Sequence, residues 1–167
     1  HAAGGPDALA AAAGQLAQSR GGPEVAWAVE ALAAAVRETP PDAAGLGEAH
    51  LNLAGMFQGL RAPARALTHY DAALPLLEDE KLRALCVLRH AALLMEEDRP
   101  ADAATLLRST SRSVPQVYEL RMLLADALAA QGMAASAELE YRSILNRFRL
   151  SPERHREVKA RLDALAD

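Results

Sequence analysis

Histidine and cysteine are the residues of this chain best suited to bind a metal or act as nucleophiles, and their spacing predicts neither role. His50, His69, His90 and His155 fall on separate predicted helices and are never three or four residues apart, so no pair of ligands is preset on one helix. His50 and His90 are interpreted as packing or partner-facing residues. Cys86, the only cysteine, lies in an apolar helical stretch, which predicts a buried, unreactive thiol. The sequence therefore predicts no metal site.

The glycines and the hydroxyl and acidic residues predict no cofactor or catalytic site. The Gly-Gly pair at 21–22 is not followed by the lysine and the serine or threonine of a phosphate-binding loop. Serine, threonine and acidic residues form no recognisable set of nucleophile and base. The acidic run at 78–80 precedes a predicted helix, where negative charge is favourable, so its role is interpreted as structural. We therefore expect a protein that is not an enzyme, with no catalytic residues and no cofactor.

The composition of the 167-residue chain indicates a helical domain. Alanine and leucine, both strong helix formers, dominate the 51% of apolar residues, and aromatic residues make up only 4%, which nearly excludes an all-β fold. A net charge of −4 indicates neither a nucleic-acid-binding protein nor one that lies on a membrane surface. No apolar run reaches the length of roughly 18 residues that a membrane-spanning helix needs. The excess of arginine over lysine is typical of a GC-rich bacterial coding sequence.

Prolines mark a repeating unit. Pro23, Pro63 and Pro100 each precede a run of good helix formers, and proline is well tolerated at the first position of a helix. Their spacings are 40 and 37 residues, and Ala134 stands 34 residues after the third proline. Such periods predict four repeats, each a pair of helices.

The second repeat carries a recognisable pattern. It places large, small and aromatic residues at fixed intervals on both sides of a turn: Leu53, Ala54, Phe57, Ala66, Tyr70 and Ala73. This pattern resembles the tetratricopeptide repeat, with His50 in place of the usual tryptophan and Arg61 in place of the usual turn glycine. The fourth repeat resembles it as well, and there the turn glycine, Gly132, is present. The chain is thus similar to bacterial tetratricopeptide repeat proteins.

The resemblance implies an all-α fold, an α–α superhelix (solenoid) of about four helical hairpins with a C-terminal capping helix. The repeat region is expected at 6–150, with hairpins at about 6–40, 46–77, 80–111 and 114–149. The capping helix is expected within 151–167, and residues 1–5 are interpreted as the remnant of an expression tag. The individual helices are expected at 6–19, 23–37, 46–60, 63–74, 80–97, 100–109, 114–131, 134–148 and 152–166.

Two classes of core residue follow from the repeat register. Small residues let paired helices approach closely, and this role is expected of Ala54, Ala66, Ala91, Ala103, Ala125 and Ala137. Large residues fill the space between neighbouring pairs, and this role is expected of Leu53, Phe57, Tyr70, Leu94, Leu107, Leu124, Leu128 and Tyr141.

The resemblance also implies a place for a partner. In this family the first helix of each hairpin lines a concave groove that holds a peptide or a helix of another protein. The groove residues expected in the second repeat are Glu48, Leu51, Asn52, Gly55 and Gln58. Those expected in the third are Leu85, Leu88, Arg89, Ala92 and Met95. Those expected in the fourth are Glu119, Met122, Leu123, Asp126 and Ala129.

Two functions are compatible with these features. The first is a non-enzymatic adaptor or scaffold that binds a partner peptide or helix in the groove. The alternative is an architectural subunit that forms a homo-oligomer or bridges parts of a larger bacterial envelope or secretion assembly. Neither involves a nucleic acid or a membrane span. The sequence leaves the bacterial cytoplasm and the periplasm both open.

Overall fold

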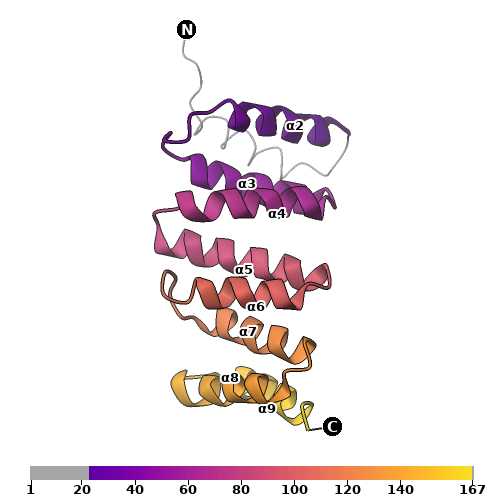
Figure 1. Ribbon diagram of the computed structural model, residues 1–167, viewed down its shortest axis with the longest axis vertical. Helices are drawn as coiled ribbons and strands as arrows, with labels where there is room; N and C mark the ends of the chain where they lie inside the picture. Colours follow the sequence, from indigo (N-terminus) through magenta and orange to yellow (C-terminus); the bar gives the residue numbers. More distant parts are fainter. Residues whose placement is uncertain (1–22, 167) are drawn as a thin grey trace. The chain divides into compact units, whose positions relative to one another are not determined.

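The computed structural model describes residues 23–166, and these fold into helices joined by short turns (Figure 1). This part of the chain holds eight α-helices, one short 3-10 helix and no strand. They are α2 (Pro23–Arg37), α3 (Leu46–Gly59), α4 (Pro63–Ala73), η1 (Leu74–Leu76), α5 (Glu80–Glu96), α6 (Pro100–Ser109), α7 (Tyr118–Ala130), α8 (Ala134–Arg147) and α9 (Pro152–Asp163). The predicted all-α class is confirmed. The tag remnant expected at 1–5 and the helix expected at 6–19 lie outside the described residues.

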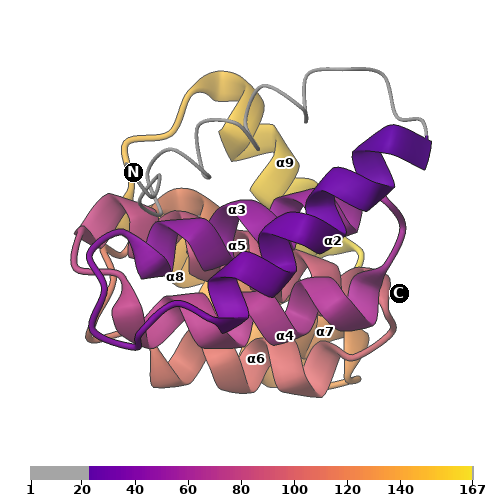
Figure 2. The same cartoon turned by 90° about the horizontal axis from the view of Figure 1, so that it is seen from above.

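The chain divides into two compact halves, His1–Cys86 and Val87–Asp167, and α5 contributes to both. In the N-terminal half, α3 and α4 pack closely as a hairpin, and α2 packs against α3 (Figures 1 and 2). In the C-terminal half, α7 packs against α6 and α8, and α8 packs against α9. No helix among residues 23–166 is long and apolar enough to cross a membrane.

The start of α7 is the largest departure from the predicted boundaries. The sequence predicts a helix from residue 114, but α7 begins at Tyr118. Pro115 has no N–H to donate, and Val117 has an extended backbone with φ −95° and ψ 158°. The side-chain amide of Gln116 donates hydrogen bonds to the carbonyls of Ser111 and Val114, at 2.6 and 3.3 Å. These bonds hold the segment before α7 as a turn. The last helix is shorter than expected too, ending at Asp163 rather than at 166.

The same turn joins the two helices of three successive repeats. In each case one residue has a positive φ: Arg61 (56°), Asp98 (55°) and Gly132 (72°). The N–H of the following residue donates to the carbonyl five residues back, over 2.8 to 3.0 Å. This is the Schellman arrangement, which satisfies carbonyls at the end of the first helix. The second helix then begins two residues after the positive-φ residue, at Pro63, Pro100 and Ala134.

The core matches the repeat register. All six small residues expected at close approaches of paired helices are fully buried, and this expectation of burial is confirmed. The eight large residues expected in the core are buried as well, from Leu53 in α3 to Tyr141 in α8. The predicted starts of α5 and α9 hold as well. Asp79 accepts hydrogen bonds from the N–H groups of Lys81 and Leu82, and Ser151 accepts one from that of Arg154.

The positive φ of Asp98, in the turn between α5 and α6, leads to a prediction about stability. Asp98 has a left-handed backbone, which costs a residue with a Cβ about 1–2 kcal/mol. Glycine removes that strain but loses more entropy on folding. We expect Asp98→Gly to raise the free energy of unfolding by about 0.5–1 kcal/mol in urea denaturation.

Gly132→Ala provides the opposite test at the next turn. A Cβ at this position would meet no atom within 4 Å, so strain at φ 72° is the only cost. We expect a loss of about 1 kcal/mol. Equal stability of Asp98→Gly and the natural chain would contradict the strain argument.

Candidate functional site

The predicted groove residues of the N-terminal half lie on α3, and one of them is not accessible. Asn52 is exposed, and Glu48, Gly55 and Gln58 are half-buried. Leu51 is only 4% exposed, so its expected place on an open groove is corrected to a place in the core. The side-chain carbonyl of Gln58 accepts a hydrogen bond from the hydroxyl of Tyr70, at 3.0 Å. This bond ties Gln58 to the second helix of its own hairpin.

The predicted groove residues of α5 form a partly exposed apolar stripe. Leu85, Leu88, Ala92 and Met95 follow one another at intervals of three, four and three residues and therefore share one face of the helix. All four are half-buried. Arg89 is exposed beside them. The stripe thus offers an aliphatic surface with a cationic group at its edge.

On α7 the predicted groove residues differ in what they contact. Leu123 and Ala129 are half-buried. Met122 is 6% exposed, so its expected exposure to a partner is corrected: it belongs to the core. Glu119 and Asp126 both form ion pairs with α9, over 2.7 Å to Arg154 and 2.8 Å to Arg161. The two acidic residues are therefore engaged by the chain itself.

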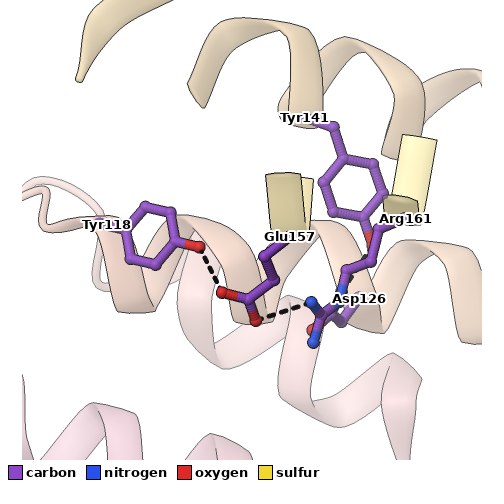
Figure 3. Close-up of polar contacts among 5 residues, drawn as sticks. All are labelled: Tyr118, Asp126, Tyr141, Glu157 and Arg161. Carbon is purple, nitrogen blue, oxygen red and sulfur yellow. Dashed lines mark hydrogen bonds and ion pairs between the residues drawn. The ribbon is translucent and has the colours of Figure 1, made fainter. Parts of the chain in front are cut away.

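A network of polar side chains joins α7, α8 and α9 (Figure 3). The hydroxyl of Tyr141, from α8, donates to the carboxylate of Asp126 at 2.5 Å. The hydroxyl of Tyr118, at the start of α7, donates to the carboxylate of Glu157 at 2.9 Å, and Arg161 donates to the same carboxylate at 2.8 Å. Arg161 thus bridges two carboxylates, one on α7 and one on its own helix.

The pKa shifts in this network indicate a structural role for its side chains. Burial raises the pKa of Tyr118 to about 12, with a further contribution from its hydrogen bond to the Glu157 carboxylate. Burial also raises the pKa of Tyr141, as does its bond to Asp126. The pKa of Glu157 is lowered by the hydrogen bonds from Tyr118 and Arg161. At neutral pH both tyrosines keep their protons and Glu157 is ionised, so none of these groups is poised to transfer a proton.

The sequence predicts α9 only as a capping helix and does not predict its contacts with this region. The missed residues are Tyr118, Arg154, Glu157 and Arg161. A signal for them exists in the repeat period, because Pro152 lies 34 residues after Tyr118. Helix α9 therefore has the register of the first helix of a further repeat.

Two histidines meet in the N-terminal half, although they lie 19 residues apart. The Nδ1 atoms of His50 and His69 are 2.9 Å apart. The ring of Phe57 stacks on His69, with centroids 5.3 Å apart, and the guanidinium of Arg65 lies 3.9 Å from the Phe57 centroid. Arg65 in turn pairs with Glu30 of α2. The spacing along the sequence does not predict this pair, because its two members lie on different helices.

The histidine pair is neutral at physiological pH. Burial lowers the pKa of His69 to about 4, helped by the charge that His50 carries when it is protonated and by the nearby positive charges of Arg65 and Arg37. Burial lowers the pKa of His50 as well. A hydrogen bond between two ring nitrogens requires at least one neutral ring. Within residues 23–166 no group of three or more histidine, cysteine, aspartate or glutamate residues could hold a metal ion.

The remaining candidates for chemistry are buried. Cys86 is buried, as predicted, and its Sγ lies 3.7 Å from the carbonyl oxygen of Tyr70. His90 is 4% exposed, so of its two expected roles the packing one fits. These side chains belong to the core.

Part of the chain matches a known protein family. Residues 94–162 match the family model described as Tetratricopeptide repeat. The matched stretch begins near the end of α5 and runs into α9, so it includes the helix that carries Arg154, Glu157 and Arg161. A search of curated proteins found no match.

Proposed function

Because residues 94–162 match the tetratricopeptide repeat family model, we propose that the chain is a non-enzymatic adaptor that binds a peptide or helix of a partner protein. Repeats of this family generally mediate protein–protein interaction and are generally not catalytic. The observation that carries the proposal is the partly exposed stripe on α5, formed by Leu85, Leu88, Ala92 and Met95. Aliphatic area of this kind on a helix face is what an amphipathic peptide buries when it binds.

The chemistry of the stripe favours an adaptable contact. Met95 is flexible and polarisable, so it fits partners of different shape. Ala92 has a small side chain and lets a partner backbone come close. Arg89 adds a cation that can bind a carboxylate or carbonyl of the partner. In the C-terminal half, which also holds Leu88, Ala92 and Met95, Leu123 and Ala129 of α7 are the remaining accessible apolar residues of the proposed surface.

The N-terminal half contributes a more polar surface to the proposal. Asn52 is exposed, and Glu48 and Gln58 are partly exposed. We propose that these side chains bind partner backbone groups, since amides and carboxylates are suited to that role. The architectural alternative, in which the chain forms a homo-oligomer or part of a larger assembly, stays a prediction.

A photo-crosslinking experiment tests the site. A photoreactive phenylalanine analogue is placed at Ala92 on α5 and, as a matched control, at Ala101, which is exposed on α6. We expect position 92 to crosslink a partner in cells of the source organism that position 101 does not. Identical crosslinked proteins at the two positions would argue against the α5 surface.

Binding of the purified partner then gives the energetic test. We expect the double variant Leu88→Ala/Arg89→Glu to weaken binding at least tenfold, which corresponds to about 1.4 kcal/mol. Arg112→Glu is the control, because it reverses the charge of an exposed arginine in the turn between α6 and α7. An unchanged dissociation constant for the double variant, with its helicity intact, would exclude the proposed surface.

A further inference from the structure

Helix α9 is attached to the C-terminal half mainly through charged groups. Val158 is its only fully buried side chain, and Leu162 is half-buried. Most of its other side chains between Pro152 and Asp163 are exposed. The ion pairs that join it to α7 are partly exposed to solvent, and exposed ion pairs contribute little to stability. Helix α9 is therefore held by weak and salt-sensitive contacts.

The contacts between α7 and α9 nevertheless have a defined spacing. Glu119 and Asp126 are seven residues apart on α7, which places them two turns apart on one face. Their partners, Arg154 and Arg161, are also seven residues apart on α9. Each acid therefore meets one arginine. The match sets the register of one helix on the other.

Aromatic residues reinforce this register at the start of α7. The guanidinium of Arg154 lies 4.5 Å from the centroid of the Tyr118 ring, while the Tyr118 hydroxyl donates to Glu157. Phe148, in the linker between α8 and α9, packs edge-on against the same ring at 6.4 Å. The surface beneath α9 thus contacts both the charged and the apolar side chains of this segment.

We propose that this surface of α7 and α8 is a docking site for helix α9 of a second copy of the chain, and that copies exchange their α9 helices once a second copy competes with the tethered helix. The surface and the helix that fits it are both present in one chain, and charge complementarity defines the fit. The linker from Phe148 to Ser151 has an extended backbone at both ends, with ψ of 139° and 157°. Rotation there would carry α9 away from its own chain. Exchange of an identical element is a low-cost route to a dimer.

The attachment within one chain sets the conditions for exchange. A tethered α9 has a high effective concentration at its own docking site, in the millimolar range for short linkers. The natural chain at micromolar concentration therefore keeps its α9 in place. Exchange becomes dominant when the charges on α9 no longer complement those on α7 of the same chain but complement those on α7 of another chain.

A peptide-binding experiment tests the docking site without altering it. The variant Arg154→Glu/Arg161→Glu leaves α7 and α8 unchanged but places acidic residues opposite Glu119 and Asp126. We expect its α9 amides to lose protection from hydrogen exchange while those of α7 and α8 keep theirs. A fluorescent peptide of residues 150–166 should then bind this variant at least tenfold more tightly than it binds the natural chain. The control peptide carries the same two substitutions and should not bind.

Several outcomes would overturn the proposal. One is a variant that binds no peptide although α7 and α8 remain protected. Another is an α9 that stays protected despite its reversed charges. Equal binding of the natural and the charge-reversed peptide would also contradict a site defined by charge.

Mixing two variants tests the exchange itself. The second variant, Glu119→Arg/Asp126→Arg, carries the complementary reversal on α7, so each variant mismatches itself and matches the other. We expect each to be monomeric in light scattering alone and the mixture to form a one-to-one dimer that dissociates in high salt. Asp126→Arg also removes the acceptor of the Tyr141 hydroxyl. A mixture of the single variants Glu119→Arg and Arg154→Glu is therefore a milder version of the same test. A mixture in which all of the folded variants remain monomeric would exclude exchange.

Discussion

An Ala137→Phe variant should be less stable than the natural chain by about 1–3 kcal/mol, because the added ring has no space on the inner side of α8. Ala137 is fully buried in a helix that packs closely against α7. The larger side chain would force either an unfavourable rotamer or a shift of α8. Urea denaturation followed by circular dichroism measures the change in the free energy of unfolding.

A control on the same helix separates overpacking from other effects of the substitution. Ala135 is exposed on α8, so Ala135→Phe should change stability by no more than about 0.5 kcal/mol. The equivalent pair in the N-terminal half is Ala66→Phe, fully buried on α4, with exposed Ala64→Phe as its control. Equal unfolding midpoints for the buried and exposed substitutions would show that the repeat register is wrong.

The sequence predicts the hairpins well because local signals coincide with the repeat period. Pro63 and Pro100 begin α4 and α6, and Ser151 caps α9, as their side chains alone predict. The small and large core positions repeat with the same period and are all buried. Each of these features depends on residues close together in the chain.

Features that depend on packing between distant residues were not predictable in the same way. Gly47 shows why: a Cβ there would lie 2.9 Å from the backbone carbon of Leu76, a contact that only the folded hairpin reveals. The burial of Leu51 and Met122 likewise depends on their neighbours in space. Repeat position assigns both to the groove face, but the packed structure places them in the core.

The candidate site was predictable in outline and not in its contacts. The stripe on α5 follows from helical spacing, since its members share one face. The pairing of Glu119 and Asp126 with α9 requires the register of two helices that are more than 20 residues apart in the sequence. A sequence pattern identifies the acids as surface residues without saying that arginines of the same chain already bind them.

The histidine pair of α3 and α4 should make the stability of the protein depend on pH below neutrality. The folded-state pKa of His69 is about 4, below its ordinary value of 6.5, so the unfolded chain binds a proton more readily than the folded one. This contribution to stability is fully present above pH 6.5 and is lost as the pH falls toward 4. For a half-buried side chain, solvent screening reduces the expected loss at pH 4.5 to about 1–2 kcal/mol.

Urea unfolding at intervals between pH 7.5 and 4.5 measures this loss of stability. The variant His69→Gln should show a weaker dependence of the free energy of unfolding on pH, because glutamine stays neutral and can still bind the His50 ring. His155→Gln is the matched control, since His155 is exposed on α9 and should leave the pH dependence unchanged. The comparison is most direct from pH 6.5 to 5, because carboxylates begin to protonate only below this range. The pKa values of Glu30 and Glu157 in particular are lowered by their arginine and tyrosine partners. A His69→Gln chain that loses stability over this interval as steeply as the natural chain would assign the acid sensitivity to other groups. A flat response would assign it to protonation of His69, which contacts His50 across α3 and α4.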